Sequence, residues 1–409
     1  MIHRRWNYVL VIAAWCVALC GLIACGGNNT ASPPATLPAL PTATTMPAAA
    51  TQLPPPPVSV TQAAPATPTP LMITPLPTPE ATLAPPITGL IGPDQIPANV
   101  NPLTGETVAD TALLAHRPLA IKVSNSSAVV RPQSGLNSAD LVFEHYTEGG
   151  ITRFTAVYYS RGAELVGPIR SGRLIDLEIP KMYDAAFAYS GSSAPVRDLV
   201  RSSSFFDRVI SPDFGHDGFW RDYEIGNPDK PGWETLYTNT DTLRRLLQQR
   251  GLDNAPQLPA NMAFSEAPPP NGVAVTSLSF QYLGTNVFWQ YDAGSQRYLR
   301  WVDGEPHLDA NTNTQLNFRN VIAVAANHVD TLILEDEVAG GNYSIEIQLW
   351  GEGPVSIFRN GLRYDGRWRR SDPNHMITFY DLDGNVIPLA PGNSFFQVVP
   401  LGFTGLTTQ

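Results

Sequence analysis

The sequence predicts an α+β fold, in which a mixed α/β domain at residues 93–258 precedes a mostly antiparallel all-β domain at residues 273–409. The first region contains both strand-like segments and segments with the apolar spacing of helices. Short strand-like segments joined by Asp-Gly and Asn-Gly turns fill the second almost completely, which is typical of a small sandwich or barrel. Between them, the proline- and alanine-rich residues 259–272 indicate a linker.

The first domain is expected to open with three strands and to continue with two helices. The strand segments are PLAIKVSN (118–125), ADLVFEHYTE (139–148) and ITRFTAVYYS (151–160). Only Gly149-Gly150 separates the last two, which indicates a two-residue hairpin. The helices are expected at 194–203, with apolar residues on one side, and at 240–251, from a Thr or Asp cap to Gly251.

The N-terminal residues 1–24 have the pattern of a secretory signal, with Arg4 and Arg5 before an apolar run. The run ends in Leu-Ile-Ala-Cys, which resembles the bacterial lipobox. That resemblance implies lipidation of Cys25 and its position as the first mature residue, with the lipid anchoring the protein to the membrane. An uncleaved transmembrane anchor is the alternative, although the run is short for a span of roughly 20 residues. Both interpretations place the remaining chain outside the cytoplasmic membrane.

Residues 25–92 are interpreted as a disordered stalk. Residues 30–87 hold 17 of the 39 prolines and the single charge Glu80, so they cannot bury enough apolar surface to fold. A proline-rich chain rises about 3.1 Å per residue, which allows a reach on the order of 100 Å. The segment is interpreted as a stalk through the cell-wall layer or glycan coat, or as plain disorder without a length requirement, and the two interpretations do not exclude each other.

Composition excludes several classes of function. All three cysteines, Cys16, Cys20 and Cys25, lie at or before the cleavage site, so the folded part has no disulfide, thiolate metal site or cysteine nucleophile. This excludes the L,D-transpeptidases. The net charge is −10, and −12 once Arg4 and Arg5 are removed, which is unlike the basic surface of a nucleic-acid-binding protein.

Several sequence blocks occur in the order typical of one family. They are NPLTG (101–105), RPQSGLNSAD (131–140), EGGITRF (148–154), VGPIRSGR (166–173), FWRD (219–222) and YLRWVDGEPHLD (298–309). With these blocks, residues 100–401 resemble the YerB-like bacterial lipoproteins, whose two domains have no settled function. KPGWETLYTN (230–239) departs from the family pattern, because it lacks the histidine expected there.

The expected hairpin groups charged residues on one face. With Gly149-Gly150 as its loop, Tyr146 lies opposite Arg153 and Glu144 lies opposite Thr155. Arg153 then has Glu144 and Glu148 on its two diagonals. These two carboxylates are the candidate catalytic acid/base pair, and Arg153 is a candidate binding residue.

The segment VGPIRSGR carries two further candidate binding residues, Arg170 and Arg173, in a loop bounded by glycines. Two neighbouring cations need separate compensation. We expect one to pair with an acidic side chain of the hairpin and the other to face a cleft near Trp220. The alternative is that all these charges satisfy one another as a scaffold.

The remaining binding candidates lie in two blocks of polar and aromatic residues. They are Arg131, Gln133 and Asp140 in RPQSGLNSAD, and His216, Trp220, Arg221 and Asp222 in FGHDGFWRD. Aromatic, carboxylate and arginine side chains together are typical of a carbohydrate site, and also of ordinary loops. No cofactor or metal site is predicted: DLDGN (381–385) has Gly392 where a calcium loop has Glu, and His307 with Asp309 lacks further ligands.

Two hypotheses follow. The first is a lipid-anchored, extracytoplasmic binding or scaffolding protein of the cell envelope that recognises an anionic or glycan ligand, with an envelope protein as a further candidate partner. The second is a metal-independent hydrolase or lyase of wall polymer that uses Glu144 and Glu148. The second requires both carboxylates to line an open cleft.

Overall fold

The computed structural model describes residues 89–125, 127–336 and 341–409, and all of them belong to one compact unit. The predicted signal, the lipidation site Cys25 and nearly all of the predicted stalk lie outside the described residues. No helix of the described part is long and apolar enough to cross a membrane. The predicted α+β class is confirmed: three short α-helices accompany many strands, and the described strands form no closed barrel.

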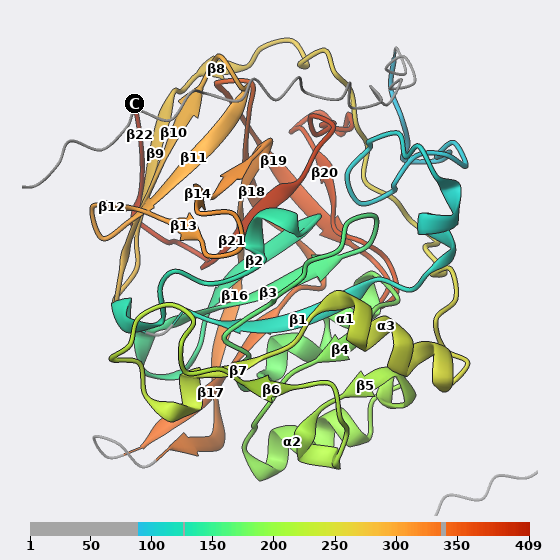
Figure 1. Ribbon diagram of the computed structural model, residues 1–409. Helices are drawn as coiled ribbons and strands as arrows, with labels where there is room; N and C mark the ends of the chain where they lie inside the picture. The colour runs from blue at the N-terminus through green and yellow to red at the C-terminus, as the bar shows by residue number, and fades with distance from the viewer. Residues whose placement is uncertain (1–88, 126, 337–340) are drawn as a thin grey trace, which may run out of the picture. The chain divides into compact units, whose positions relative to one another are not determined.

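A twelve-stranded sheet forms the centre of the fold (Figure 1). Eight of its strands follow the order β20 (Thr378–Tyr380), β19 (Leu362–Arg370), β18 (Gly351–Arg359), β16 (Asn320–Asp336), β21 (Ser394–Pro400), β2 (Leu141–Tyr146), β3 (Thr152–Tyr158) and β1 (Leu119–Ser124). The order ends with β4 (Ala186–Ala188) and β5 (Val209–Ile210), while β17 (Asn342–Gln348) pairs with β16 and β8 (Val273–Ala274) with β19. Strands from both sides of the predicted linker therefore share one sheet.

The strands β2 and β21 are the junction between the two halves of the chain. They pair in parallel, with Phe143 next to Phe396, and β21 pairs in parallel with β16 on its other edge. Most other pairs in the sheet are antiparallel, including β2 with β3 and β1 with β3.

A second, six-stranded sheet comes from the C-terminal half alone. Its strands are β12 (Glu305–Pro306), β11 (Arg297–Val302), β10 (Asn286–Asp292), β9 (Ser277–Gln281), β22 (Leu406–Thr408) and β15 (Asn317–Phe318). Two small hairpins complete the strands, β13 (Leu308–Asp309) with β14 (Thr314–Gln315) and β6 (Trp220–Arg221) with β7 (Leu236–Tyr237).

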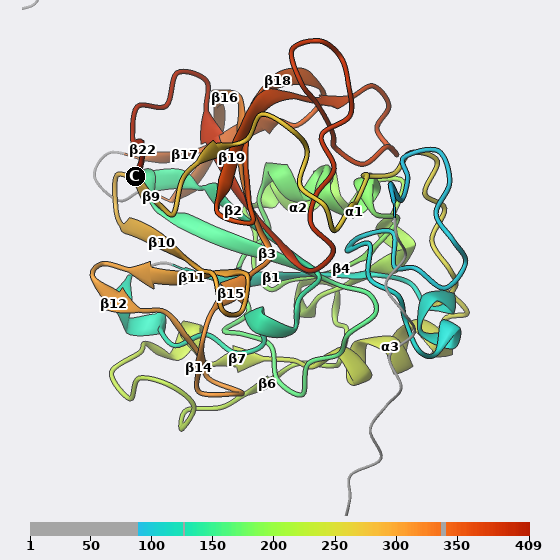
Figure 2. The same ribbon diagram turned by 90° about the horizontal axis from the view of Figure 1, so that it is seen from above.

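The helices lie on opposite faces of the central sheet (Figure 2). The two predicted helices are found as α2 (Ala194–Arg201) and α3 (Thr240–Gln249), with α1 (Ile179–Met182) in addition. The cap of α3 is Asn239, which accepts a hydrogen bond from the Thr242 amide, one residue before the predicted Thr or Asp cap. The 3₁₀ turns are η1 (Thr111–Ala115), η2 (Ala128–Val130), η3 (Leu136–Ser138), η4 (Glu148–Gly150), η5 (Leu174–Leu177), η6 (Phe206–Arg208), η7 (Pro212–Phe214) and η8 (Gly232–Glu234).

Alternation along the strands divides the core into two clusters, one on each face of the sheet. Phe143 and Phe396 pack with residues of α1 and α2, whereas their neighbours Val142 and Phe395 pack with α3 and the six-stranded sheet. The central strands read as nearly continuous apolar runs because both of their faces are buried.

Candidate functional site

The β2–β3 hairpin is antiparallel, as predicted, but its predicted register is wrong by one residue. Arg153 lies opposite His145, and Tyr146 lies opposite Thr152. Glu148, Gly149 and Gly150 form a 3₁₀ turn in which both glycines have positive φ, so the connection is longer than the expected two-residue loop. A shift of one residue moves side chains to the other face of a strand. Glu144 and Arg153 consequently lie on opposite faces of the sheet.

On one face, Glu144 is bound by residues of the six-stranded sheet and its surroundings. Its carboxylate accepts hydrogen bonds from Arg300 at 2.7 Å, from Asn125 at 3.0 Å and from Thr152 at 2.8 Å. Both Glu144 and Arg300 are fully buried. The predicted acid/base pair of Glu144 and Glu148 is therefore not formed, because Glu144 lines no open cleft and lies across the sheet from Arg153 and Arg173, which bind Glu148.

Arg300 itself occupies an aromatic cage. Its guanidinium carbon lies 5.3 to 5.6 Å from the ring centres of Phe154, Trp289 and Phe395. His307 accepts from Arg300 through Nδ1 and donates through Nε2 to Gln133 at 2.6 Å. This tautomer is neutral, in agreement with the low pKa of His307 that burial and then the Arg300 charge produce.

On the other face, two arginines bind the hairpin-turn carboxylate Glu148. Arg173 donates from Nε at 2.6 Å and from a second nitrogen, and Arg153 donates at 3.2 Å. Burial alone would raise the pKa of Glu148, but the hydrogen bond and charges of the arginines outweigh it and hold the pKa at about 2. Arg173 also lies 3.5 Å from Glu335 of β16.

A fully buried lysine lies deeper on the same face. Lys122 Nζ lies 2.7 Å from Asp176 Oδ2, 3.1 Å from Thr155 and 2.7 Å from His145 Nε2. Burial lowers the pKa of Lys122 to about 8, although Asp176 opposes the shift. His145 donates from Nδ1 to the Tyr146 carbonyl, so its Nε2 accepts from Lys122.

The two arginines of VGPIRSGR do have separate acidic partners. Arg173 pairs with the hairpin residue Glu148, as predicted. The expectation of a free Arg170 is wrong, because its Nε lies 3.0 Å from Glu234, a carboxylate of η8 that is almost completely buried. Burial raises the pKa of Glu234, against the charge of Arg170.

Glu148 also lines a pocket of about 470 Å³ at the tip of the hairpin, which we call the hairpin-tip pocket. The turn 148–150, Leu283 and the β16–β17 hairpin form its walls. Aromatic and polar side chains share the lining: Tyr146, Tyr343 and His328 with Asp330 and Asn342. Because the walls come from both halves of the chain, residues far apart in the sequence form the pocket.

His328 lines this pocket, but its second ring nitrogen is buried and not exposed to a ligand. Its Nδ1 donates to the Ala326 carbonyl at 3.0 Å, and its Nε2 has no hydrogen-bond partner among the described residues. Burial lowers the pKa of His328, so the ring is neutral at pH 7. Sequence reasoning missed His328, Asp330 and Tyr343, because nothing in their spacing places them beside EGG (148–150).

The other predicted binding residues do not gather in this pocket. Asp140 is buried and accepts hydrogen bonds from Asn101, Ser160 and the Tyr159 amide. Arg131 pairs with Asp303 at 2.6 Å, and Gln133 is buried beside His307. His307 and Asp309 form no metal pair: Asp309 accepts from the amides of Gly135 and Asn137.

The FGHDGFWRD block forms a loop around the β6–β7 hairpin. His216 Nδ1 accepts from the Ser211 amide, Arg221 donates to Gly232 and Thr235, and Asp222 accepts from the Glu224 amide. Trp220 is exposed. These polar groups mainly stabilise their own loop, and none of them lines the hairpin-tip pocket.

Two models of known protein domains match the chain. Residues 103–253 match the model of the N-terminal domain of a protein of unknown function, DUF3048, and residues 278–396 match its C-terminal domain. The chain belongs to this two-domain family. Both models together cover well over half of the sequence, in agreement with the resemblance to YerB-like proteins.

One relative and one solved structure are also similar to the chain. The chain is 29% identical over 305 residues to the "Putative lipoprotein YerB" of Bacillus subtilis, covering 73% of this chain and 86% of the relative. The crystal structure of the YerB protein from Bacillus subtilis matches with a TM-score of 0.63 and 26% identity, over 76% of this chain and 99% of that one.

Proposed function

We propose that the protein is a lipid-anchored, extracytoplasmic binding protein of the bacterial cell envelope, and that its hairpin-tip pocket binds a glycan. The lipobox-like ending at Cys25 and the similarity to a relative named as a lipoprotein support the anchor. The lining of the pocket supports the ligand, since aromatic rings, carboxylates and an amide are the groups that bind sugar rings and hydroxyls.

The fixed position of Glu148 is the observation that carries the proposal. Two arginines hold its carboxylate, and its low pKa keeps it ionised at neutral pH. A carboxylate fixed in this way accepts hydrogen bonds from a ligand without losing much side-chain freedom on binding. Tyr343, which is about half exposed, supplies a ring of the same pocket for stacking.

Binding of purified wall glycan fragments to the full chain tests the ligand. We expect Tyr343→Ala to weaken binding at least tenfold, while Tyr223→Ala, which removes an exposed tyrosine outside the pocket, leaves it unchanged. Equal affinities of the wild type and Tyr343→Ala would refute the glycan site.

Cys25→Ser tests the anchor. Because the cysteine thiol is the group acylated in a lipoprotein, the variant should remain an unprocessed precursor without incorporated palmitate analogue. Labelling of the variant at the wild-type level would contradict lipidation at Cys25.

A further inference from the structure

We infer that a second site, separate from the hairpin-tip pocket, binds the phosphate groups of a phosphodiester-linked polymer. The site consists of two adjoining pockets of about 640 and 330 Å³, which we call the phosphate groove. Pro259 lines both pockets, while the neighbours Asn374 and His375 line one each, so the pockets are contiguous.

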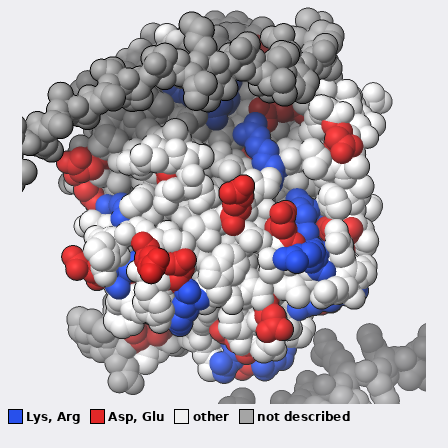
Figure 3. Space-filling view, in the orientation of Figure 1, with Lys and Arg blue, Asp and Glu red and all other residues white. Residues whose placement is uncertain are grey.

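The lining of the phosphate groove is cationic although the chain as a whole is acidic. Arg117, Lys181 and Arg208 line the larger pocket and Arg369 and Arg370 the smaller one, against the carboxylates of Asp184 and Asp94. On the face shown in Figure 3, acidic and basic side chains are interspersed.

In the larger pocket, two guanidinium groups share one carboxylate. Arg117 lies 2.7 Å from Asp184 Oδ2, and Arg208 lies 3.0 Å from Asp184 Oδ1. One carboxylate compensates only one of the two charges, and the nearby Asp207 is exposed, so water screens its effect. An anion in the pocket would compensate the second charge.

The same arrangement recurs at the boundary between the pockets. Glu178 lies 3.2 Å from Lys181 and 2.7 Å from Arg370, so again one carboxylate serves two cations. Arg370 is fully buried and donates to the carbonyls of Leu349 and His375, so it contributes charge rather than contact.

Uncharged polar side chains of the phosphate groove are also suited to bind an oxyanion. The side chains of Ser204, Gln257 and Asn374 line the larger pocket and make no hydrogen bond within the described part of the chain. Hydroxyl and amide donors beside arginines are the usual ligands of phosphate oxygens.

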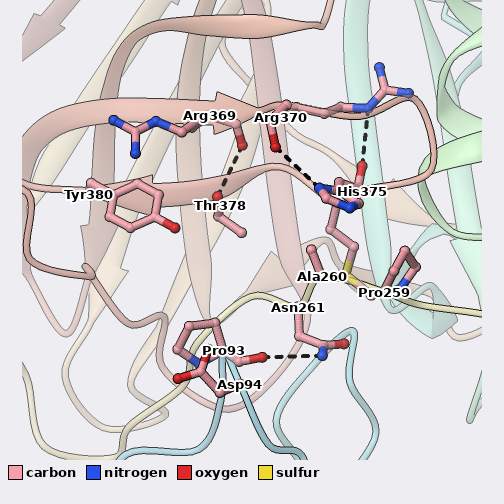
Figure 4. A pocket seen from close by; sticks show the side chains of 12 residues that line it. Pro93, Asp94, Pro259, Ala260, Asn261, Arg369, Arg370, His375, Thr378 and Tyr380 are labelled. Atoms are coloured by element: carbon pink, nitrogen blue, oxygen red, sulfur yellow. Dashed lines mark hydrogen bonds between the residues drawn. The ribbon is translucent and has the colours of Figure 1, made fainter.

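Figure 4 shows the smaller pocket, where Arg369 and His375 lie on the wall opposite Asp94 and Asn261. Arg369 is half exposed and packs on the Tyr380 ring at 4.8 Å, and Glu352 lies 3.4 Å from it. Two neighbouring recessed pockets with accessible cations suit successive phosphates of one polymer better than a flat membrane surface.

The test uses the full chain in detergent at low salt, with inorganic phosphate and a soluble glycerol phosphate polymer as probes. We expect the polymer to bind at least tenfold more tightly than phosphate and to dissociate at high salt. The double variant Lys181→Gln/Arg208→Gln should weaken polymer binding at least tenfold. Arg197→Gln/Arg201→Gln removes the same charge from α2, outside the groove, and should retain the wild-type affinity.

Two outcomes would overturn the inference. Equal loss of affinity in both double variants would show that net charge alone attracts the polymer. Binding to vesicles of anionic phospholipid without binding to the soluble polymer would assign the groove to a lipid surface instead. Because Tyr343→Ala leaves the groove intact, it should bind the polymer normally, so this test is independent of the glycan proposal.

Discussion

Three charged residues surround Glu148 in the fold, namely Arg153, Arg173 and Glu335, and the sequence predicted only some of them. Arg153 and one of the two arginines Arg170 and Arg173 were predicted near the hairpin carboxylates. Glu335, on a strand almost 190 residues further along, was not predicted, and it shares Arg173 with Glu148. All four of these side chains are less than a tenth exposed. Water therefore screens their charges weakly, and each depends on its partners for compensation.

Separate replacement of the two loop arginines should give unequal effects. Arg173→Gln removes the bidentate partner of buried Glu148 and an ion-pair contact of Glu335, so we expect a loss of about 3 kcal/mol or more in the free energy of unfolding. Arg170→Gln should cost clearly less, since Arg170 is a quarter exposed and the raised pKa of Glu234 lets that carboxyl take up a proton. Urea denaturation of both variants at pH 7 measures the difference. Equal losses would contradict this distinction.

Glu148 also makes stability depend on pH in a defined direction. Its pKa is about 2 in the folded chain against an ordinary 4.5, so the folded state binds its proton less tightly than the unfolded state does. The resulting stabilisation, roughly 3 kcal/mol, is present above pH 4.5 and is lost as the pH falls toward 2. The difference in unfolding free energy between wild type and Glu148→Gln, measured from pH 6 to pH 2.5, should therefore shrink with falling pH. A constant difference would assign the effect of the variant to packing alone.

At the scale of elements, β2 carries one charge network on each face. Glu144 belongs to the network with Arg300, and His145 belongs to the network with Lys122. The strand-like composition of the sequence predicted β1, β2 and β3 within one or two residues, because burial of each strand depends on its own side chains. The register could not be predicted in this way, since it depends on the turn, and Glu148 is held in that turn by arginines from other elements.

The residues of the candidate site were even harder to predict from the sequence than the strand register, because they lie far apart in the chain. The partner of Glu144 is Arg300, 156 residues away, and the hairpin-tip pocket combines EGG (148–150) with Tyr343. No local spacing contains such pairs. The residue types were predictable from the sequence: two carboxylates and several arginines near one hairpin. One of Arg170 and Arg173 was predicted to pair with a hairpin carboxylate, but the sequence did not decide which of the two.

The contact of β2 with β11 can be tested by a double-mutant cycle. Arg300→Met should cost about 3–5 kcal/mol, because it leaves the buried carboxylate of Glu144 without its cation. Glu144→Gln/Arg300→Met should recover part of that loss, since no unpaired charge remains. Chemical denaturation of wild type, both single variants and the double variant gives the coupling free energy. A coupling near zero would show that the two side chains act independently.

At the scale of the whole molecule, the two family domains are joined through their sheets. The N-terminal strand β2 pairs with the C-terminal strand β21, and core residues from both halves pack together on each face. Sequence composition indicated a linker at 259–272 and, from it, two domains. The linker residues Pro259, Ala260 and Asn261 instead line a pocket with residues of the C-terminal half.

Separation of the halves should therefore abolish stable folding. A fragment of residues 93–258 exposes the edge of β2 and the apolar face that Phe396 covers. We expect this fragment to lack a cooperative thermal transition, whereas the full chain shows one. Differential scanning calorimetry of the fragment, alone and mixed with residues 273–409, tests this expectation. A sharp transition of the isolated fragment would establish an independent N-terminal domain.

The pairing of β2 with β21 has a consequence for how the protein is made. The two strands lie about 250 residues apart, so the middle of the sheet has a high contact order and is expected to close slowly. A chain exported in the order of its synthesis delivers β2 and β3 long before Ser394–Pro400, with one edge of β2 unpaired in the meantime. The strand Ser394–Pro400 thus decides when the sheet is complete, and chains that lack it should be removed by proteolysis rather than accumulate.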